Sequence, residues 1–226
     1  MNPFRRVKNS VTWRAGRRLD RAAVARAHDA LYASDAWTQA RWLGTQALKN
    51  PLDLWVYQEI IVETRPELVV ETGTWRGGSA FYMASILDLV GDGEVVSIDV
   101  EPMRDDYPEH PRITYLAGRS STDPAVVEEI RGRAEGRRVL IVLDSDHSQA
   151  HVEAELAAYA RLVQVGGYVI VEDSNIGRIR KDLLPGPLEA IGTFIASTDE
   201  FAIDREREKF LITHNPSGYL KRIKVS

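Results

Sequence analysis

One feature constrains the fold of this chain most: an apolar run that ends in an acid and passes through a glycine-rich turn into a helix-like stretch. The run covers residues 68–72, and the turn Gly73-x-x-x-Gly77-Gly78 leads into a helix that we expect over 79–89. Glycines let a ligand approach the backbone, and the first turn of a helix offers unpaired N–H groups. The spacing differs from the G-x-G-x-x-G dinucleotide fingerprint. The pattern therefore predicts a βα turn that binds a ligand, although a tight turn without a ligand is the alternative.

Short apolar segments alternate with helical ones along the rest of the chain, which favours a parallel sheet with helices on both faces. The length of 226 residues suits one domain with a full core and some added structure. Residues 1–50, whose apolar anchors include Trp37 and Trp42, should form an N-terminal helical segment ahead of a domain at 51–226. We expect Asp53 to be the N-cap of the next helix. Strands are expected at 68–72, 94–99, 113–116, 138–144, 168–173, 201–204 and 209–213, and helices at 54–64, 79–89, 124–133, 148–163 and 188–197.

The composition excludes several functional classes. The net charge is −4, so no overall field favours nucleic acid, and the arginines near the N-terminus are interpreted as a solvated helix face. Cysteine is absent, which excludes disulfides and cysteine-bound zinc and fits a reducing compartment. No apolar run is long enough to span a membrane, and the first residues lack the apolar core of a signal peptide. We therefore predict a cytoplasmic protein.

Polar or acidic residues end almost every predicted strand, and the carboxyl ends of parallel strands form the edge where ligands bind. Glu71 ends the first strand and can accept from ligand hydroxyls or bind a cation. Asp99 ends the second, where a carboxylate can accept hydrogen bonds from both hydroxyls of a ribose. Ser120 and Ser121 follow the third strand in a small polar loop that could line an adenine. A single strand-end acid can instead cap a helix, but a row of them along one edge favours a ligand site.

Asp144, Glu172 and Asp173 form the sharpest acidic cluster, because they end two strands that should be neighbours about 5 Å apart. Three such carboxylates repel one another unless they are protonated or bound to a metal, and oxygen ligands favour Mg²⁺ or Mn²⁺. His147 follows the first acid by three residues and is placed to act as a general base. It could instead face solvent, or pair with His151 in a zinc-like i, i+4 site that no H-E-x-x-H pattern supports.

Further segments between residues 40 and 222 carry a family resemblance. They are Trp42-Leu43-Gly44, Lys49-Asn50-Pro51-Leu52-Asp53-Leu54-Trp55, Tyr57-Gln58-Glu59-Ile60, Glu71-Thr72-Gly73-Thr74, Gly77-Gly78-Ser79, Leu143-Asp144-Ser145-Asp146-His147-Ser148, Gly167-Tyr168-Val169-Ile170-Val171-Glu172-Asp173 and Asn215-Pro216-Ser217-Gly218-Tyr219-Leu220. In these segments the chain resembles the cephalosporin hydroxylase and rhamnosyl O-methyltransferase family of class I S-adenosylmethionine-dependent methyltransferases. The combination is specific, although the glycine-rich turn alone is not.

The resemblance implies a Rossmann-like α/β fold, with a seven-stranded, mostly parallel sheet, a reversed last strand and helices on both faces. It also implies that 51–226 is the S-adenosylmethionine-binding methyltransferase domain. The methyl donor would lie along Glu71, Gly73, Trp75 and Ser79, with Asp99 at the ribose and Ser120 and Ser121 near the adenine.

Related metal-dependent O-methyltransferases bind Mg²⁺ through the positions that match Asp144, Glu172 and Asp173, and their general base stands at the position of His147. Asp146 is a rival ligand because it shares the same loop. The resemblance therefore implies an O-methyltransferase that uses S-adenosylmethionine and Mg²⁺ or Mn²⁺. In that mechanism the metal lowers the pKa of the acceptor hydroxyl, His147 takes the proton, and the oxygen attacks the methyl group.

The expected acceptor is a hydroxyl of a small molecule and, by family analogy, of a deoxysugar or rhamnosyl group on a natural product or glycan. Two other functions stay open. A non-catalytic or partner-dependent subunit in cephalosporin-type antibiotic tailoring is disfavoured by the intact metal acids and His147, and a nicotinamide-dependent oxidoreductase by the glycine spacing. The N-terminal segment, with Trp13, Trp37 and Trp42, should pack on the core or on a second subunit, and we expect a homo-oligomer.

Overall fold

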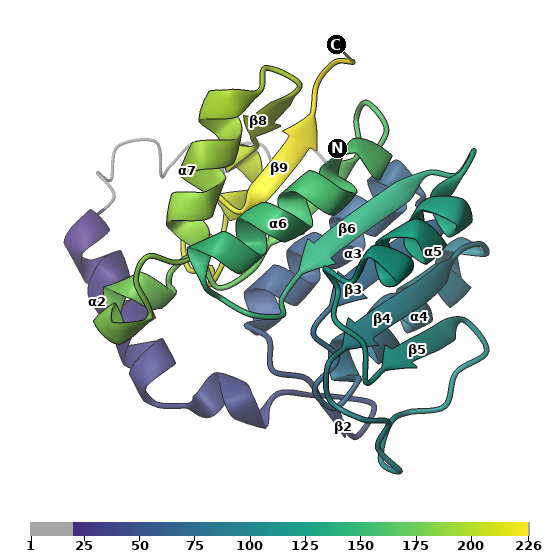
Figure 1. The fold of residues 1–226 in the computed structure, drawn as a ribbon. Coiled ribbons are helices and arrows are strands. Elements are labelled where there is room, and N and C mark those ends of the chain that lie inside the picture. The colour runs from purple at the N-terminus through teal and green to yellow at the C-terminus, as the bar shows by residue number, and fades with distance from the viewer. Residues whose placement is uncertain (1–19, 226) are drawn as a thin grey trace, which may run out of the picture.

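A seven-stranded sheet forms the centre of the computed structural model, which describes residues 20–225 (Figure 1). The strand order is β5-β4-β3-β6-β7-β9-β8, in which β3 to β7 are parallel and β9 runs antiparallel to both of its neighbours. The predicted Rossmann-like class with a reversed last strand is confirmed. Residues 1–19 of the expected N-terminal segment lie outside the described residues. The strands are β3 (Leu68–Thr72), β4 (Glu94–Asp99), β5 (Ile113–Ala117), β6 (Val139–Leu143), β7 (Tyr168–Val171), β8 (Phe201–Ile203) and β9 (Tyr219–Arg222).

Two apolar cores lie on the two faces of this sheet. Successive strand residues point to opposite faces, so Val69 and Val70 enter different cores. Helices α3 and α4 cover one face, and α5, α6 and α7 cover the other (Figure 1). Between residues 20 and 225, no helix is long and apolar enough to cross a membrane. The helices are α2 (Arg21–Ala33), α3 (Pro51–Thr64), α4 (Gly78–Val90), α5 (Pro124–Ala134), α6 (Gln149–Tyr159) and α7 (Pro187–Ser197), with 3₁₀ turns η2 (Ala36–Gln39), η3 (Ala160–Leu162), η4 (Ile176–Arg178), η5 (Lys181–Leu183) and η6 (Arg205–Glu208).

Helix α3 begins earlier than the sequence analysis expects. Asn50 is its N-cap, because the Asn50 side chain accepts a hydrogen bond from the first turn at 3.1 Å. An asparagine cap followed by proline at the first helical position is a preferred helix start. The expectation that Asp53 is the N-cap is wrong. Its buried carboxylate instead accepts hydrogen bonds from the backbone N–H of His214 and the hydroxyl of Tyr219, both at 2.9 Å.

The segment ahead of α3 is helical only in part. Helix α2 and turn η2 are followed by a two-stranded hairpin of β1 (Arg41–Trp42) and β2 (Thr45–Gln46), so residues 41–46 depart from the expected helical segment. Leu43 and Gly44 turn this hairpin with φ angles of 47° and 92°, a left-handed backbone that helices do not continue through. Nε1 of Trp42 donates to Oγ of Ser85 in α4 at 3.0 Å. The segment therefore packs on the sheet domain, while a domain boundary at residue 50 stays a prediction.

The position of the C-terminal strand also differs from the sequence analysis. The strand expected at 209–213 is wrong, because residues 209–211 form a turn and a bend and 212–213 are irregular, and β9 follows later between β7 and β8. Gly218 allows the chain to pass close to β7 just before β9 begins, since a Cβ at that position would lie 2.1 Å from the backbone oxygen of Val171. The strand character of β9 depends on the two strands that flank it.

Candidate functional site

A cavity of about 860 Å³ opens beyond the carboxyl ends of β3, β4, β6 and β7. Four of the residues that line it, Gly73, Asp99, Asp144 and Asp173, stand at or shortly after the ends of these strands. This is the edge of an open α/β sheet where ligands bind, and the volume is in the range of small-molecule sites. The cavity is therefore the candidate active site.

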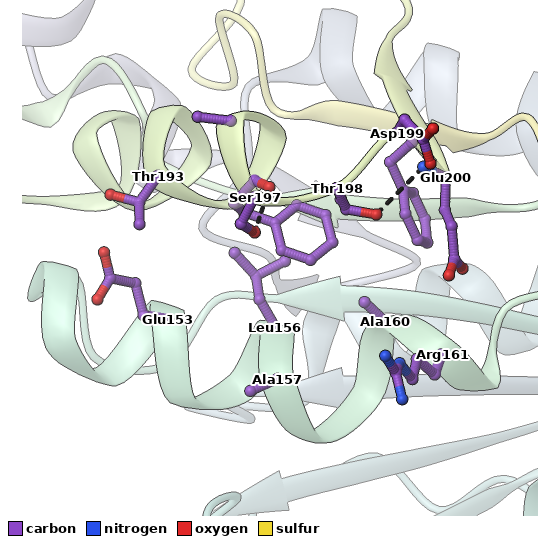
Figure 2. Close-up of a pocket in the computed structure, with 13 residues that line it drawn as sticks. Glu153, Leu156, Ala157, Ala160, Arg161, Thr193, Ser197, Thr198, Asp199 and Glu200 are labelled. Atoms are coloured by element: carbon purple, nitrogen blue, oxygen red, sulfur yellow. Dashed lines mark hydrogen bonds between the residues drawn. The ribbon is translucent and has the colours of Figure 1, made fainter. Parts of the chain in front are cut away.

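A second cavity, also of about 860 Å³, lies between α6 and α7 on one face of the sheet (Figure 2). Its walls include Leu156 and Ala160 of α6, and Figure 2 shows Thr193 and Ser197 on the facing helix. Every predicted site residue that lines either cavity lines the one at the strand ends. The chemistry is therefore assigned to that edge and not to the helical groove.

Asp99 fixes the glycine-rich loop, a role that its place at a strand end did not predict. Its Oδ2 accepts hydrogen bonds from the backbone N–H groups of Thr74 at 2.7 Å and Trp75 at 3.0 Å, and its Oδ1 accepts from Glu101 at 2.9 Å. Trp75 has a left-handed φ of 48°. Such a backbone is costly for a bulky residue, and the two hydrogen bonds support it. Asp99 also lines the cavity.

Gly73 brings two strand ends into direct backbone contact. Its φ is +85°, and a Cβ there would lie 2.0 Å from the backbone oxygen of Asp144, so a larger residue would displace that strand end. The backbone N–H of Asp144 in turn donates to the carbonyl of Thr72 at 3.0 Å. The glycine-rich loop, predicted to bind the donor, and Asp144, predicted to bind the metal, are therefore in direct backbone contact.

The other residues predicted to bind the donor divide between the cavity and its surroundings. Trp75, Ser79 and Ser121 line the cavity. The hydroxyl of Ser120 instead lies 3.0 Å from that of Thr122, within the loop after β5. The donor-binding roles of all four residues stay predictions.

Glu71 lies in the layer beneath the loop. The side chain is fully buried, and its Oε2 accepts a hydrogen bond from the hydroxyl of Ser97 at 2.6 Å. Burial raises the pKa of Glu71 to about 7, although the nearby charge of Lys49 acts to lower it. A carboxyl group with this pKa exchanges its proton close to neutral pH.

Asp144, His147 and Asp173 form a cluster whose ligand atoms all lie within 4.8 Å of one another. Nε2 of His147 is 3.3 Å from Oδ2 of Asp173, and burial raises the pKa of Asp144. Asp173 has a left-handed φ of 50°, a strained backbone of the kind found at functional sites. The rival ligand Asp146 lines the same cavity, but it accepts a hydrogen bond from the backbone N–H of Ser148 at 2.7 Å.

The alternative pair of histidines does not share a partner. Nε2 of His151 lies 3.2 Å from Oγ of Ser121 and 3.4 Å from Oε1 of the buried Glu155. The hydrogen bond with Glu155 raises the pKa of His151. His147 faces Asp173 instead. These separate partners count against a zinc-like site built on the two rings.

Glu172, the third acid predicted to bind the metal, is held by other groups. Its Oε1 accepts a hydrogen bond from the hydroxyl of Tyr57 at 2.7 Å and lies 2.8 Å from Nζ of Lys49. Burial raises the pKa of Glu172 well above its ordinary value, and the charge of Asp144 raises it further. Both contacts use the same carboxylate oxygen.

Lys49 is the site residue that the sequence reasoning missed. Its side chain is only 3% exposed, and its ammonium pairs with both Asp144 and Glu172. Burial alone would lower the pKa of Lys49, but the two carboxylates raise it above the ordinary value. A buried ammonium thus offsets the repulsion among acids that the sequence analysis attributed to a metal. The only local signal is the position of Lys49 directly before the helix cap Asn50.

The family model described as Rhamnosyl O-methyltransferase/CmcI matches residues 34–223. The chain belongs to this family. The rhamnosyl O-methyltransferase of Mycobacterium tuberculosis is 36% identical over 208 residues, which cover 86% of this chain and 83% of the relative. The protein of the same name from Mycobacterium leprae is 35% identical over 207 residues, covering 86% of this chain and 88% of the relative. The family and the enzyme class predicted from the sequence, an O-methyltransferase, are confirmed.

Solved structures share the fold of this rhamnosyl O-methyltransferase/CmcI family member. An apo structure of CmcI superposes with a TM-score of 0.65 at 24% identity, covering 87% of this chain and 84% of the other. A structure of CmcI with Mg and SAM has a TM-score of 0.61 at 23% identity, covering 83% of this chain and 78% of the other. These likenesses concern the fold, and the assignment of residue roles rests on the geometry of the cavity.

Proposed function

We propose that this protein transfers a methyl group from S-adenosylmethionine to a hydroxyl of a sugar-bearing small molecule, with Mg²⁺ as the metal. One observation carries the proposal: a single cavity joins the glycine-rich loop and Asp99 to the cluster of Asp144, His147 and Asp173. The names of the curated relatives support a rhamnosyl acceptor, and the CmcI structure described with Mg and SAM supports the two cofactors. A nicotinamide-dependent oxidoreductase would not use the acidic cluster.

The residues at the loop end of the cavity fit the methyl donor. Gly73 and Ser79 line the cavity beside the first turn of α4, and Asp99 lines the same space. Among the described residues, Oε1 of Glu71 has no hydrogen-bond partner, which leaves a buried acceptor beneath the loop. In its ionised form this carboxylate is complementary to the ammonium group of S-adenosylmethionine.

The acids at the other end fit a hard divalent cation. Carboxylate oxygens are the ligands that Mg²⁺ prefers, and the close approach of Asp144 to Asp173 brings two of them together. We assign Asp144, Glu172 and Asp173 as the ligands, with Glu172 released from Lys49 when the cation binds. A bound Mg²⁺ would lower the pKa of the acceptor hydroxyl, and S-adenosylmethionine would supply the methyl group.

The side chains of this protein then position the acceptor and move its proton. Nε2 of His147 faces Asp173, which leaves Nδ1 to take the proton from the acceptor hydroxyl. The Asp173 carboxylate orients the ring and stabilises the imidazolium that forms, as in other acid–histidine pairs. Lys49 neutralises part of the negative charge of the acids.

Calorimetry on the purified protein tests the proposal directly. The titrations are run with and without Mg²⁺. S-adenosylmethionine should bind, and NAD⁺ and NADP⁺ should not. Mass spectrometry should then detect a methylated product from methyl α-L-rhamnopyranoside, with activity lost in EDTA and restored by Mg²⁺ or Mn²⁺. Binding of a nicotinamide cofactor, or full turnover in excess EDTA, contradicts the proposal.

Three finer points stay predictions from the sequence: a glycosylated acceptor, a homo-oligomer and a cytoplasmic location. The relatives named rhamnosyl O-methyltransferases support the first. Trp55, which is 59% exposed on α3, and Leu43, which is 74% exposed in the hairpin, offer apolar surface for association. Light scattering on the full chain would measure its oligomeric state.

A further inference from the structure

We propose that Tyr32 and Trp37 form the wall on which the acceptor binds, and that this wall receives the C–H face of a pyranose ring. The inference rests on the proposed function, because it names the residues that would select the acceptor of that reaction. It concerns a part of the chain outside the strand-end motifs. Tyr32 even precedes residues 34–223, which the family model matches.

The two aromatic rings form a fixed platform at the edge of the cavity. Their centroids lie 5.4 Å apart at an interplanar angle of 30°, and Nε1 of Trp37 donates to the backbone oxygen of Tyr32 at 3.2 Å. Both side chains are partly exposed and both line the cavity at the strand ends. The amide of Gln46 donates to the backbone oxygen of Thr38 at 2.7 Å, which ties η2 to the hairpin. Trp37 is therefore bonded to Tyr32 and lies on a turn that the hairpin holds in place.

His214 joins this platform to the acidic end of the cavity. Its ring makes edge contacts with Tyr32 and Trp37, at centroid distances of 5.3 Å and 5.1 Å. Nδ1 of His214 lies 3.9 Å from Oδ1 of Asp173. The ring of His214 is buried and packs as an aromatic group between the platform and Asp173. The platform thus ends one side chain away from the pair of His147 and Asp173.

This arrangement matches the two faces of a sugar. One face of a pyranose carries several C–H bonds, which are attracted to the electron-rich face of an aromatic ring, while its hydroxyls spread outward. A sugar seated on Tyr32 and Trp37 would direct a ring hydroxyl toward Asp173 and His147. The additional methyl group of a 6-deoxysugar would bury more apolar surface on the same rings.

Saturation-transfer NMR with methyl α-L-rhamnopyranoside tests the wall without requiring methyl transfer. The full chain is titrated as wild type, Trp37→Ala, Trp37→Phe and Tyr32→Ala, and S-adenosylmethionine affinity is measured by calorimetry on the same samples. Trp37→Ala should weaken glycoside binding about tenfold, on the scale of an aromatic stacking contact. Trp37→Phe should retain most of the affinity because it keeps a ring. The affinity for S-adenosylmethionine should not change.

Trp42→Ala is the matched control, because Trp42 belongs to the same segment but packs on α4. Its ring contacts Tyr82 at 4.8 Å and its Nε1 bonds to Ser85. Glycoside affinity should be preserved in this variant. An equal loss in Trp42→Ala and Trp37→Ala would report a loosened segment and would overturn the inference.

Three further outcomes separate the inference from the proposed function. Unchanged glycoside affinity in both Trp37→Ala and Tyr32→Ala overturns the wall, as does a wild-type protein that binds catechol and no pyranoside. Loss of S-adenosylmethionine affinity in Trp37→Ala also overturns it, because the ring would then serve the donor. A protein that binds the pyranoside through Trp37 but does not bind S-adenosylmethionine supports the wall and contradicts the proposed function.

Discussion

The Nζ atom of Lys49 lies 2.8 Å from Oε1 of Glu172, and the same ammonium pairs with Asp144. A cation supplied by the protein therefore stands beside two of the acids that the sequence assigns to a metal. A buried ion pair stabilises the folded state little compared with two apolar residues in its place. Removal of one partner, however, leaves the other as an uncompensated buried charge, which is strongly destabilising. Lys49 is thus the group that allows these acids to stay close together before a metal binds.

Lys49→Met should lower the free energy of unfolding by about 3–5 kcal/mol, because the buried acids lose their counter-charge. Mg²⁺ should restore part of the loss, since a divalent cation bound to the folded state relieves the same repulsion. The rise in Tm on addition of Mg²⁺ should therefore be larger in the variant than in wild type. Thermal unfolding followed by circular dichroism, in Mg²⁺ and in EDTA, measures both effects.

Lys209→Met is the control for this prediction. Lys209 also pairs with a carboxylate, Glu59, but it is 44% exposed at the surface. Exposed pairs of this kind contribute roughly 0–1 kcal/mol, so the loss of stability should be small and independent of Mg²⁺. Equal losses in the two variants would show that burial of the Lys49 pair is not decisive.

Removal of a carboxylate ligand should weaken metal binding more than removal of the proposed base. Glu172→Gln should raise the Kd for Mn²⁺ by at least about tenfold, whereas His147→Ala should change it little. Titration by electron paramagnetic resonance measures both values on protein that need not be active. The opposite ranking would place His147 among the ligands with Asp144 and Asp173, and it would remove His147 from the role of general base.

His147→Ala should lower turnover by roughly 10²–10⁴-fold, the usual contribution of a general base. His151→Ala should have a much smaller effect, because His151 faces Ser121 and Glu155. Neither variant should alter the affinity for S-adenosylmethionine greatly. Equal and small effects on turnover would favour activation of the acceptor by the metal without a protein base.

Asp99→Ala should weaken S-adenosylmethionine binding by about 1–3 kcal/mol, the scale of hydrogen bonds to a charged group. The variant also loses the hydrogen bonds that hold Thr74 and Trp75, so the loop itself should become less ordered. Asp99→Asn keeps one acceptor oxygen, so its affinity for S-adenosylmethionine should lie between those of wild type and Asp99→Ala. Calorimetry measures the affinities, and an unchanged Kd in Asp99→Ala would exclude this residue from the donor site.

Stability should depend on pH through Glu71. Burial raises the pKa of Glu71 from its ordinary value of 4.5 to about 7, so the folded state binds a proton that the unfolded chain has already lost. This contribution is fully present below about pH 4.5 and is lost as the pH rises through about 7. It amounts to on the order of 3 kcal/mol. Urea unfolding of wild type and Glu71→Gln between about pH 4.5 and 7 measures this contribution, because the difference in their free energies of unfolding should change by about 3 kcal/mol. A difference that stays constant with pH would mean that Glu71 is ionised at neutral pH.

The interior strands could be predicted because each carries its own apolar signal. The expected bounds of β3 and β4 are those of the structure. The tail shows the limit of that reasoning. The apolar triplet in 209–213 contains Phe210 and Leu211, which are 38% and 49% exposed in a turn and a bend. Strand β9 instead contains Lys221 and Arg222 and takes its pairing from β7 and β8, which its own residues do not specify.

The meeting of Asp99, Asp144 and Asp173 at one cavity could be predicted because the edge of a parallel sheet brings strand ends together. The partners of the Glu172 side chain could not be predicted from the sequence. Lys49 precedes the N-cap of α3 and Tyr57 lies within that helix, and both reach Glu172 only through packing in three dimensions. No spacing in the sequence encodes that contact.

Gly73 touches the backbone of Asp144 so closely that the loop on one strand and the acid on the next cannot shift independently. A displacement of the loop on donor binding would therefore be transmitted to Asp144, a proposed ligand of the cation. Linkage then requires the cation to change the affinity for the donor by the same factor as the donor changes the affinity for the cation. The size of this coupling would not depend on which of the two cofactors binds first.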